Sequence, residues 1–366
     1  MFWLWLACST PPPTPPPGPP GVLDDVVRVG TILPIEGEAG AVGRAARDVL
    51  VAAFLQAKVH DRNVEIVVRH APIGESLSTV KALVAEEQIF ALVAPQTSGE
   101  EEAFARWAGE SGVPVVAPFG GRPSTSSVVN EMFWLYGGPA DQLRGVVQHT
   151  RGDALALVSA EGDGPSRERV EAVVYQASRG NQELRRASHS DACSALALEG
   201  IKAVILEGPE AEARAWLEAA SAEQCDLDLY MTSDWVPPLL GDGAVPWFGR
   251  LFSTSPSRPA DWTPRGVADL IGLVGEAELK LRPVQAASLS AARLLLEGLE
   301  QAGPDLDRSG LLVRMGAIQG FRTGLTPILS YGPRRRVGAL GAWIVERDPR
   351  TAQPLGGDSE RWVAPR

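Results

Sequence analysis

The stretch ALVAPQTSGEEEAFARWAGESGVPVVAPFGG, residues 91–121, decides the fold class. It predicts a buried strand at 91–94, a helix at 100–110 and a second buried strand at 113–117. A strand, helix and strand in this order require a right-handed crossover and parallel pairing. Both strands therefore end at the same edge of one sheet.

The two strand ends carry the candidate ligand site. Parallel α/β sheets bind ligands at this edge, where backbone N–H groups and helix N-termini attract anions. Thr97, Ser98 and Gly99 therefore lie where a small anionic group would be held, and the second strand ends in Phe119-Gly120-Gly121 at the same edge. The alternative is that Ser98 only caps the helix, with Glu101 completing a capping box.

The alternation of strands and helices continues on both sides of this stretch. Before it, strands at 26–33 and 64–69 alternate with helices. A second alternation begins near residue 139, with strands at 154–158, 203–206 and 227–231. We therefore predict an α/β protein with two doubly wound parallel-sheet lobes.

These patterns divide the chain into a tether, two lobes and a tail. The lobes are discontinuous, because the pattern leaves the first lobe and returns to it. The last segment, FRTGLTPILSYGPRRRVGALGAWIVERD, predicts two strands around a Gly-Pro turn. The predicted parts are residues 1–25 for the tether, 26–138 and 256–325 for lobe 1, 139–255 and 326–348 for lobe 2, and 349–366 for the tail.

Composition argues against several classes of function. The net charge of −11 is opposite to what a nucleic-acid partner requires. The four histidines are scattered and show no helical spacing typical of metal ligands. No phosphate-binding loop and no nucleophile elbow is present in the sequence. We therefore expect no enzyme activity, no metal and no cofactor.

The N-terminus, MFWLWLACST, resembles the end of a bacterial lipoprotein signal, in which the cysteine after a small residue is lipidated. Cys8 is that cysteine, and the proline-rich segment 11–20 after it predicts an extended tether. We expect a lipid-anchored protein of the periplasm or cell envelope. The alternative is a disordered cytosolic tail. No run of about 18 apolar residues occurs in the sequence.

Cys193 and Cys225 are the remaining cysteines. In an exported protein, two such cysteines are candidates for a disulfide. However, we expect Cys193 at the start of a short helix and Cys225 just past the end of another, at opposite edges of the sheet. That separation exceeds the Cα distance of about 7 Å that a disulfide spans. The sequence therefore predicts two free, packed thiols.

Several segments together resemble the leucine/isoleucine/valine-type solute-binding proteins of ABC transporters. They are Leu83 to Pro118, AARLLLEGLEQAGPDLDRSGLL at 291–312, Gly324-Leu325-Thr326-Pro327, Leu329-Ser330-Tyr331-Gly332, Arg336-Val337-Gly338 and Ile344-Val345. The resemblance covers residues 26–348. It implies a type 1 periplasmic binding fold, with lobe crossings near 136–139, 256–260 and 323–327.

The resemblance also implies a function. It implies an exported receptor that captures an amino acid, or a related small amine or amide, between its lobes and delivers it to an ABC permease. Carried over by position, Asp234 holds the ligand's ammonium group, and the ligand's carboxylate is held by Thr97, Ser98 and Gly99 together with Phe119, Gly120 and Gly121. Trp235 and Glu207 complete the candidate set. The alternative for Asp234 is a cap on the turn before Pro237.

The sequence departs from the family at several positions. Val42, Gly164 and Glu207 stand where aromatic residues are frequent in the family. Glu36 and Glu38 are additional acids, which either complement a helix N-terminus or favour a ligand with extra positive charge. The alternative function is a lipoprotein scaffold or regulator, for example of cell-wall synthesis, that reuses the fold without transport.

Overall fold

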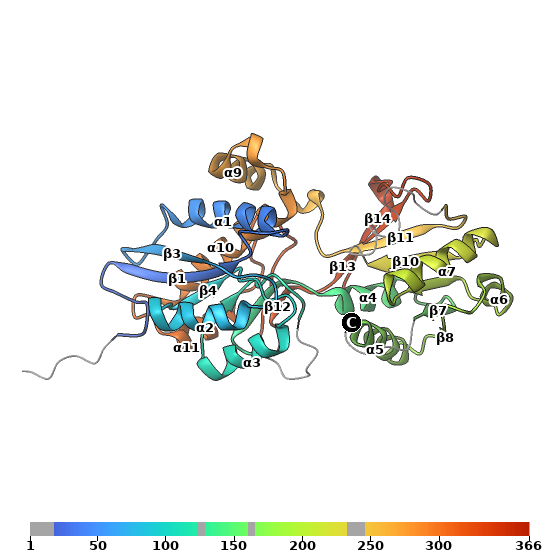
Figure 1. Ribbon diagram of the computed structural model, residues 1–366, viewed down its shortest axis with the longest axis horizontal. Coiled ribbons are helices and arrows are strands. Elements are labelled where there is room, and N and C mark those ends of the chain that lie inside the picture. The colour runs from blue at the N-terminus through green and yellow to red at the C-terminus, as the bar shows by residue number, and fades with distance from the viewer. Residues whose placement is uncertain (1–17, 123–128, 160–164, 233–245, 366) are drawn as a thin grey trace, which may run out of the picture.

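Two α/β lobes lie side by side along the long axis of the computed structural model, which describes residues 18–122, 129–159, 165–232 and 246–365 (Figure 1). Each lobe has a seven-stranded sheet within this described part of the chain. The prediction of two doubly wound lobes is therefore confirmed.

The sheet of the first lobe has the strand order β12-β6-β5-β4-β1-β3-β2. β1 pairs in parallel with both β3 and β4, as alternating strands and helices require. The strands are β1 (Val26–Leu33), β2 (Lys58–Val59), β3 (Arg62–His70), β4 (Ala91–Val93), β5 (Val115–Val116), β6 (Met132–Tyr136) and β12 (Val337–Ala339).

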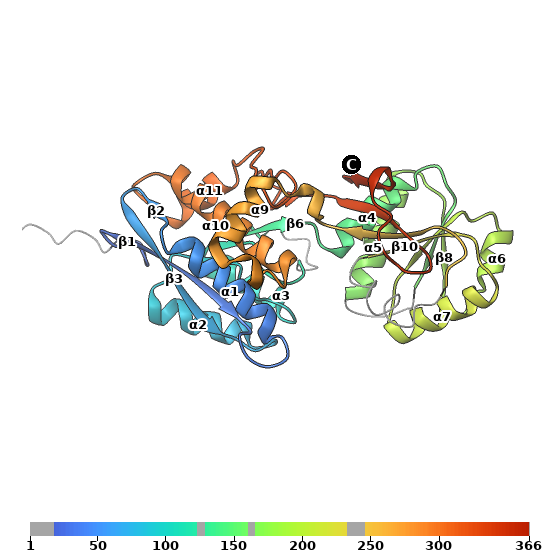
Figure 2. The same ribbon diagram turned by 90° about the horizontal axis from the view of Figure 1, so that it is seen from above.

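Helices cover both faces of this sheet. Leu50 of α1 and Leu295 of α10 pack on one face, and Leu83 of α2 and Phe104 of α3 pack on the other. Helix α9 packs on α1 and α10 (Figure 2). The helices are α1 (Gly40–Phe54), α2 (Ser76–Glu87), α3 (Glu101–Ser111), α9 (Pro264–Val274), α10 (Arg282–Ala302) and α11 (Arg308–Met315).

The sheet of the second lobe has the order β14-β13-β11-β10-β9-β7-β8. Its strands are β7 (Leu155–Val158), β8 (Leu184–Ala187), β9 (Ala203–Leu206), β10 (Asp228–Thr232), β11 (Leu251–Ser255), β13 (Ala342–Arg347) and β14 (Glu360–Val363). Its helices are α4 (Pro139–His149), α5 (Pro165–Arg179), α6 (Cys193–Leu198) and α7 (Glu210–Ala222). β14 lies in the segment that we assigned to a tail, and it pairs antiparallel with β13.

The third crossing between the lobes is not where we predicted it. We expected it near 323–327, but β12 pairs with β6 in the first sheet, so the chain crosses at residues 340–341. Residues 326–339 therefore belong to the first lobe. The cause is Tyr331, which is 1% exposed and donates a hydrogen bond to the Trp134 carbonyl at 3.1 Å.

The final segment also differs from its predicted pattern of one strand on each side of the Gly-Pro turn. Both strands, β12 and β13, follow the turn. Before it, Phe321 and Leu329 form only an isolated bridge. Gly324 with φ +82° and Pro327 keep that part irregular, because neither residue suits a continuous ladder.

Cys193 and Cys225 form a disulfide, so the prediction of two free thiols is wrong. Their Cα atoms are 6.0 Å apart. We placed Cys193 at the carboxyl edge of the sheet because it follows β8. The turn at residues 188–192 instead runs along α7: the Asp191 carbonyl lies beside Trp216 in the middle of that helix, and the Ser194 N–H lies beside Glu223 just past its end, so Cys193 reaches the end of α7 where Cys225 lies.

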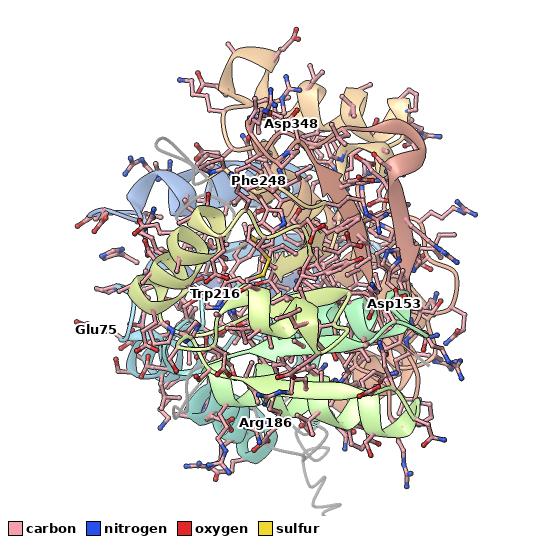
Figure 3. All side chains as sticks on the ribbon, turned by 90° about the vertical axis from the view of Figure 1, so that its right-hand side faces the viewer. Glu75, Asp153, Arg186, Trp216, Phe248 and Asp348 are labelled. Carbon is pink, nitrogen blue, oxygen red and sulfur yellow. A yellow bond between two sulfur atoms is a disulfide. The ribbon has the colours of Figure 1, made fainter. Side chains whose placement is uncertain are left out.

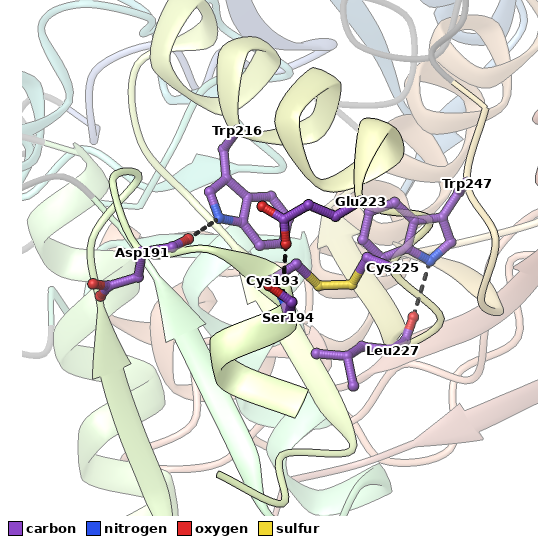
Figure 4. The surroundings of a disulfide bond; sticks show 8 residues. All are labelled: Asp191, Cys193, Ser194, Trp216, Glu223, Cys225, Leu227 and Trp247. Atoms are coloured by element: carbon purple, nitrogen blue, oxygen red, sulfur yellow. Dashed lines mark hydrogen bonds between the residues drawn. A yellow bond between two sulfur atoms is a disulfide. The ribbon is translucent and has the colours of Figure 1, made fainter. Parts of the chain in front are cut away.

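The disulfide lies inside the second lobe, next to α7 (Figure 3). Cys193 is 1% exposed and Cys225 is 7% exposed. Two hydrogen bonds join α7 and its end to the start of α6: Trp216 Nε1 donates to the Asp191 carbonyl at 3.0 Å, and the Ser194 N–H donates to Glu223 at 2.8 Å (Figure 4). The bond therefore links α6 to the end of α7.

Candidate functional site

A cavity of about 920 Å³ lies between the two lobes. Loops that follow β4 and β5 form its wall in the first lobe, and the beginnings of α4 and α5 form its wall in the second. Its lining residues are Ser98, Glu101, Glu102, Gly120, Gly121, Arg122, Gly138, Pro139, Ala140, Asp141, Arg167, Glu168, Arg169 and Glu171. We refer to this cavity as the cleft.

The two segments that the sequence analysis selected lie next to each other. The Phe119 carbonyl accepts hydrogen bonds from the Thr97 N–H at 2.7 Å and from the Thr97 hydroxyl at 3.1 Å. Thr97 is 1% exposed, so its hydroxyl is used to join the loops. Ser98, Gly120 and Gly121 are the members of the predicted set that line the cleft.

The carboxylate of Glu101 lies between these two loops. Its oxygens accept hydrogen bonds from the Gly99 N–H at 3.0 Å and from the Gly121 N–H at 3.2 Å. The predicted capping box with Ser98 is therefore not present, and the N-cap of α3 is Glu100. Sequence reasoning assigned Glu101 a helix-capping role and missed its position in the cleft wall.

An ion pair connects the lobes at the cleft. Arg122, which follows β5, donates to Asp141 in the first turn of α4 at 2.5 Å. Arg144 donates to the other carboxylate oxygen at 2.7 Å. The Asp141 side chain is only 4% exposed, and the cations compensate its burial. Sequence analysis missed both Arg122 and Asp141, although an arginine directly after two glycines at a strand end is a usable signal.

The second lobe places Glu207 behind the cleft wall. Its side chain is completely buried and accepts a hydrogen bond from Arg169 at 3.3 Å. Arg169 lines the cleft, so this arginine connects the buried Glu207 carboxylate to the cleft. Asp234 and Trp235, the other candidates in this lobe, lie outside the described residues, as does Cys8.

The acids predicted near α1 lie in solvent. Glu36 and Glu38 are exposed in the loop before α1 and are not among the lining residues of the cleft. Within the described ranges, no group of three or more His, Cys, Asp and Glu side chains is placed to hold a metal ion. In the same part of the chain, no helix has the length and apolarity to cross a membrane.

Burial raises the pKa of the Glu168 carboxyl above its usual range, although Arg122, Arg144 and Arg169 act in the opposite direction. Folding therefore favours the protonated form. The stabilisation from Glu168 is present below about pH 4, where the carboxyl is protonated in both states, and is lost as the pH rises through the raised pKa. Above that raised pKa the folded protein holds an ionised carboxylate in a partly buried position.

We expect Glu168→Gln to raise the melting temperature at pH 7–8 and to leave it unchanged at pH 4. The glutamine removes the buried charge at neutral pH, and the wild-type carboxyl is already neutral at pH 4. Thermal unfolding across this range measures the effect. Glu171→Gln is the control, because Glu171 is 64% exposed on the same helix. An equal rise at both pH values would contradict the interpretation.

Comparisons with known proteins agree with this architecture. A model of the periplasmic binding protein family matches residues 26–348. No curated protein sequence matches the chain. An ABC transporter substrate-binding protein from Desulfitobacterium hafniense, solved in complex with Leu, superposes with a TM-score of 0.69 at 14% identity, and the alignment covers 90% of this chain and 100% of that one.

Two further solved structures are similar and are described with other ligands. A solute-binding protein of an ABC transporter from Rhodopseudomonas palustris HaA2, in complex with p-hydroxybenzoic acid, has a TM-score of 0.66 at 16% identity over 93% of this chain and 98% of that one. A fatty acid ABC transporter substrate-binding protein from Thermomonospora curvata has a TM-score of 0.64 at 16% identity over 95% and 94%. At this identity the similarity establishes the fold. Together with the family match over most of its length, it shows that this chain belongs to the periplasmic binding protein family.

Proposed function

We propose that the protein is an exported solute-binding receptor that captures a small molecule in the cleft and delivers it to an ABC importer. The observation that carries the proposal is the cleft itself, which both lobes line with charged side chains. A ligand that contacts both walls binds the closed arrangement of the lobes more tightly than an open one. It therefore shifts the population toward the closed state that a permease recognises.

The charges of the cleft favour an ammonium-bearing ligand, an amino acid or a related amine or amide. Among its described lining residues, five are acidic (Glu101, Glu102, Asp141, Glu168 and Glu171) and three are basic (Arg122, Arg167 and Arg169). We propose that Asp234, which follows β10, adds a carboxylate for the ammonium group. A hydrogen bond of this kind contributes about 1.5–3 kcal/mol.

The disulfide supports a location outside the cytoplasm. Disulfides persist in oxidising compartments and are rare where thiols are kept reduced. We propose the periplasm or cell envelope as this compartment, with lipidation of Cys8 as the anchor.

The prediction for the anchor is that growth with a radiolabelled fatty acid labels the wild-type chain and not Cys8→Ala.

The test of the proposed function is a thermal-shift screen of a chain that begins at Gly18. The panel contains amino acids, amides, polyamines and short peptides. A ligand at 100 times its Kd adds about 2.7 kcal/mol to the stability of the folded state, which raises the melting temperature measurably. We expect at least one compound to raise the melting temperature of the wild type but not that of Asp234→Ala. A compound that raises both melting temperatures equally would show that Asp234 does not bind the ligand.

A scaffold or regulator is the second candidate function. The observation that favours it is the lining of the cleft, which contains no aromatic side chain among the described residues. Such a protein would act through contact with another protein of the envelope. If the protein is folded and no compound of the panel raises its melting temperature, this candidate is favoured over the receptor.

A further inference from the structure

Glu101 places a carboxylate of the protein itself where the cleft could bind an anion. The Gly99 and Gly121 N–H groups lie after β4 and β5, at the edge of the sheet where ligands bind. Backbone N–H groups at such an edge, beside the beginning of a helix, attract carboxylates and phosphates. In this structure they already donate to a carboxylate, one N–H group to each oxygen.

The neighbouring acids do not share this role. Glu100 turns away and accepts a hydrogen bond from the Leu77 N–H of α2 at 3.0 Å. Glu102 lines the cleft, but it is Glu101 that accepts the hydrogen bonds from the Gly99 and Gly121 N–H groups. Of the three successive acids, Glu101 is therefore the one whose carboxylate accepts hydrogen bonds from these two N–H groups.

The arginines of the cleft are engaged with carboxylates as well. Arg122 binds Asp141. Arg167 lies 2.9 Å from Glu171, and Arg169 lies 3.3 Å from Glu207. Each guanidinium among the described lining residues therefore has a carboxylate partner within the protein. An incoming carboxylate would have to displace a carboxylate of the chain, either from an arginine or from the two glycine N–H groups.

We infer that Glu101 is a specificity-determining residue that excludes ligands with a free carboxylate. This inference rests on the proposed receptor function and narrows its ligand class to ammonium-bearing molecules without a carboxylate, such as amines and amino-acid amides. Glu101 supplies the negative charge that the carboxylate of an amino acid would otherwise bring. Glu102 on the first-lobe wall and Glu168 on the second-lobe wall add negative charge to the cleft and attract a cation.

The first experiment measures whether Glu101 occupies the two donors, and it requires no physiological ligand. Acetate is titrated into the ¹⁵N-labelled full chain while the Gly99 and Gly121 amide resonances are followed. In Glu101→Ala we expect saturable shifts of both resonances. In the wild type we expect at least tenfold weaker binding, because acetate must displace an ionised group held by two charge-assisted hydrogen bonds, each of which changes an equilibrium constant by about tenfold or more.

Two variants control this experiment. Glu110→Ala removes the same charge from the same helix at an exposed position that does not line the cleft, so its response to acetate should equal that of the wild type. Glu101→Gln keeps a neutral acceptor and serves if Glu101→Ala fails to fold. It should bind acetate more tightly than the wild type. Equal acetate binding in the wild type and in the Glu101 variants would overturn the inference.

The second experiment tests selectivity by calorimetry with L-leucine and L-leucinamide. We expect the wild type to bind leucinamide at least tenfold more tightly than leucine, and Glu101→Ala to gain at least tenfold for leucine. Wild-type binding of leucine at least as tight as that of leucinamide would overturn the inference while the receptor function stands. Binding of neither compound by any variant, with the acetate result as expected, would count against an amine receptor and leave the role of Glu101 intact.

Discussion

Removal of the Cys193–Cys225 disulfide should lower the free energy of unfolding of the second lobe by about 3–4 kcal/mol. The two cysteines are separated by 32 residues in sequence. A crosslink over such a loop reduces the entropy of the unfolded chain, which corresponds to about 3.7 kcal/mol at 25 °C in the chain-entropy description. The measurement is guanidinium unfolding of the double variant Cys193→Ala/Cys225→Ala against the wild type.

The location of the disulfide confines the expected effect to the second lobe. The disulfide belongs to the apolar cluster of the second lobe that contains Trp216 and Trp247, whose ring centroids are 6.1 Å apart. The guanidinium concentration at the midpoint of unfolding, measured by the fluorescence of these tryptophans, should therefore fall. Core positions of the first lobe should keep their hydrogen-exchange protection. Thiol alkylation in denaturant without reductant should label neither Cys193 nor Cys225. Labelling of both would show that the bond does not form.

Substitution of Gly120 by alanine should destabilise the first lobe by about 2–6 kcal/mol and distort the cleft. Gly120 has φ +142°, a conformation that residues with a Cβ rarely adopt, and such strain costs about 1–3 kcal/mol. A Cβ at this position would lie 2.3 Å from the Thr97 hydroxyl oxygen, and the overpacking costs about 1–3 kcal/mol more. The hydrogen bonds that join Thr97 to Phe119 lie beside this contact.

The neighbouring glycine supplies the matched control. A Cβ on Gly121 would meet its nearest atom, an oxygen of Glu101, at 3.6 Å, which is ordinary van der Waals contact. Gly121→Ala should therefore change stability by well under 1 kcal/mol and keep the hydrogen bond to Glu101. Urea unfolding measures the stabilities, and the Gly99 and Gly121 amide resonances report the cleft. Equal effects of both substitutions would show that crowding at Gly120 is not the cause.

Much of the fold could be predicted because it depends on local pattern. β1 and β9 have the boundaries that the sequence predicts. Each is an apolar run bounded by Pro or charged residues, and such signals act within a few residues. Strands β11 and β14 were missed, because LFSTS and ERWV are too short and too polar to stand out.

The candidate site could be predicted in part. The strand-edge argument selected Ser98, and the family resemblance added Gly120 and Gly121; all three line the cleft. Sequence analysis missed the ion pair between Arg122 and Asp141, since its partners belong to different lobes. Their proximity depends on how the chain crosses between the lobes, and no local pattern encodes that path. The ligand roles of Asp234, Trp235 and Glu207 remain predictions.

The sequence alone determined two α/β lobes, most of their strand and helix order and the edge of the sheet that carries the ligand loops, because these follow from hydrophobic periodicity and the handedness of crossovers. The tertiary structure alone decided three features: the Cys193–Cys225 bond, the third crossing at residues 340–341 and the position of the Glu101 carboxylate between Gly99 and Gly121. Each of these depends on atoms from segments far apart in sequence. Their distances are set by how the elements pack, and packing is a property of the whole chain.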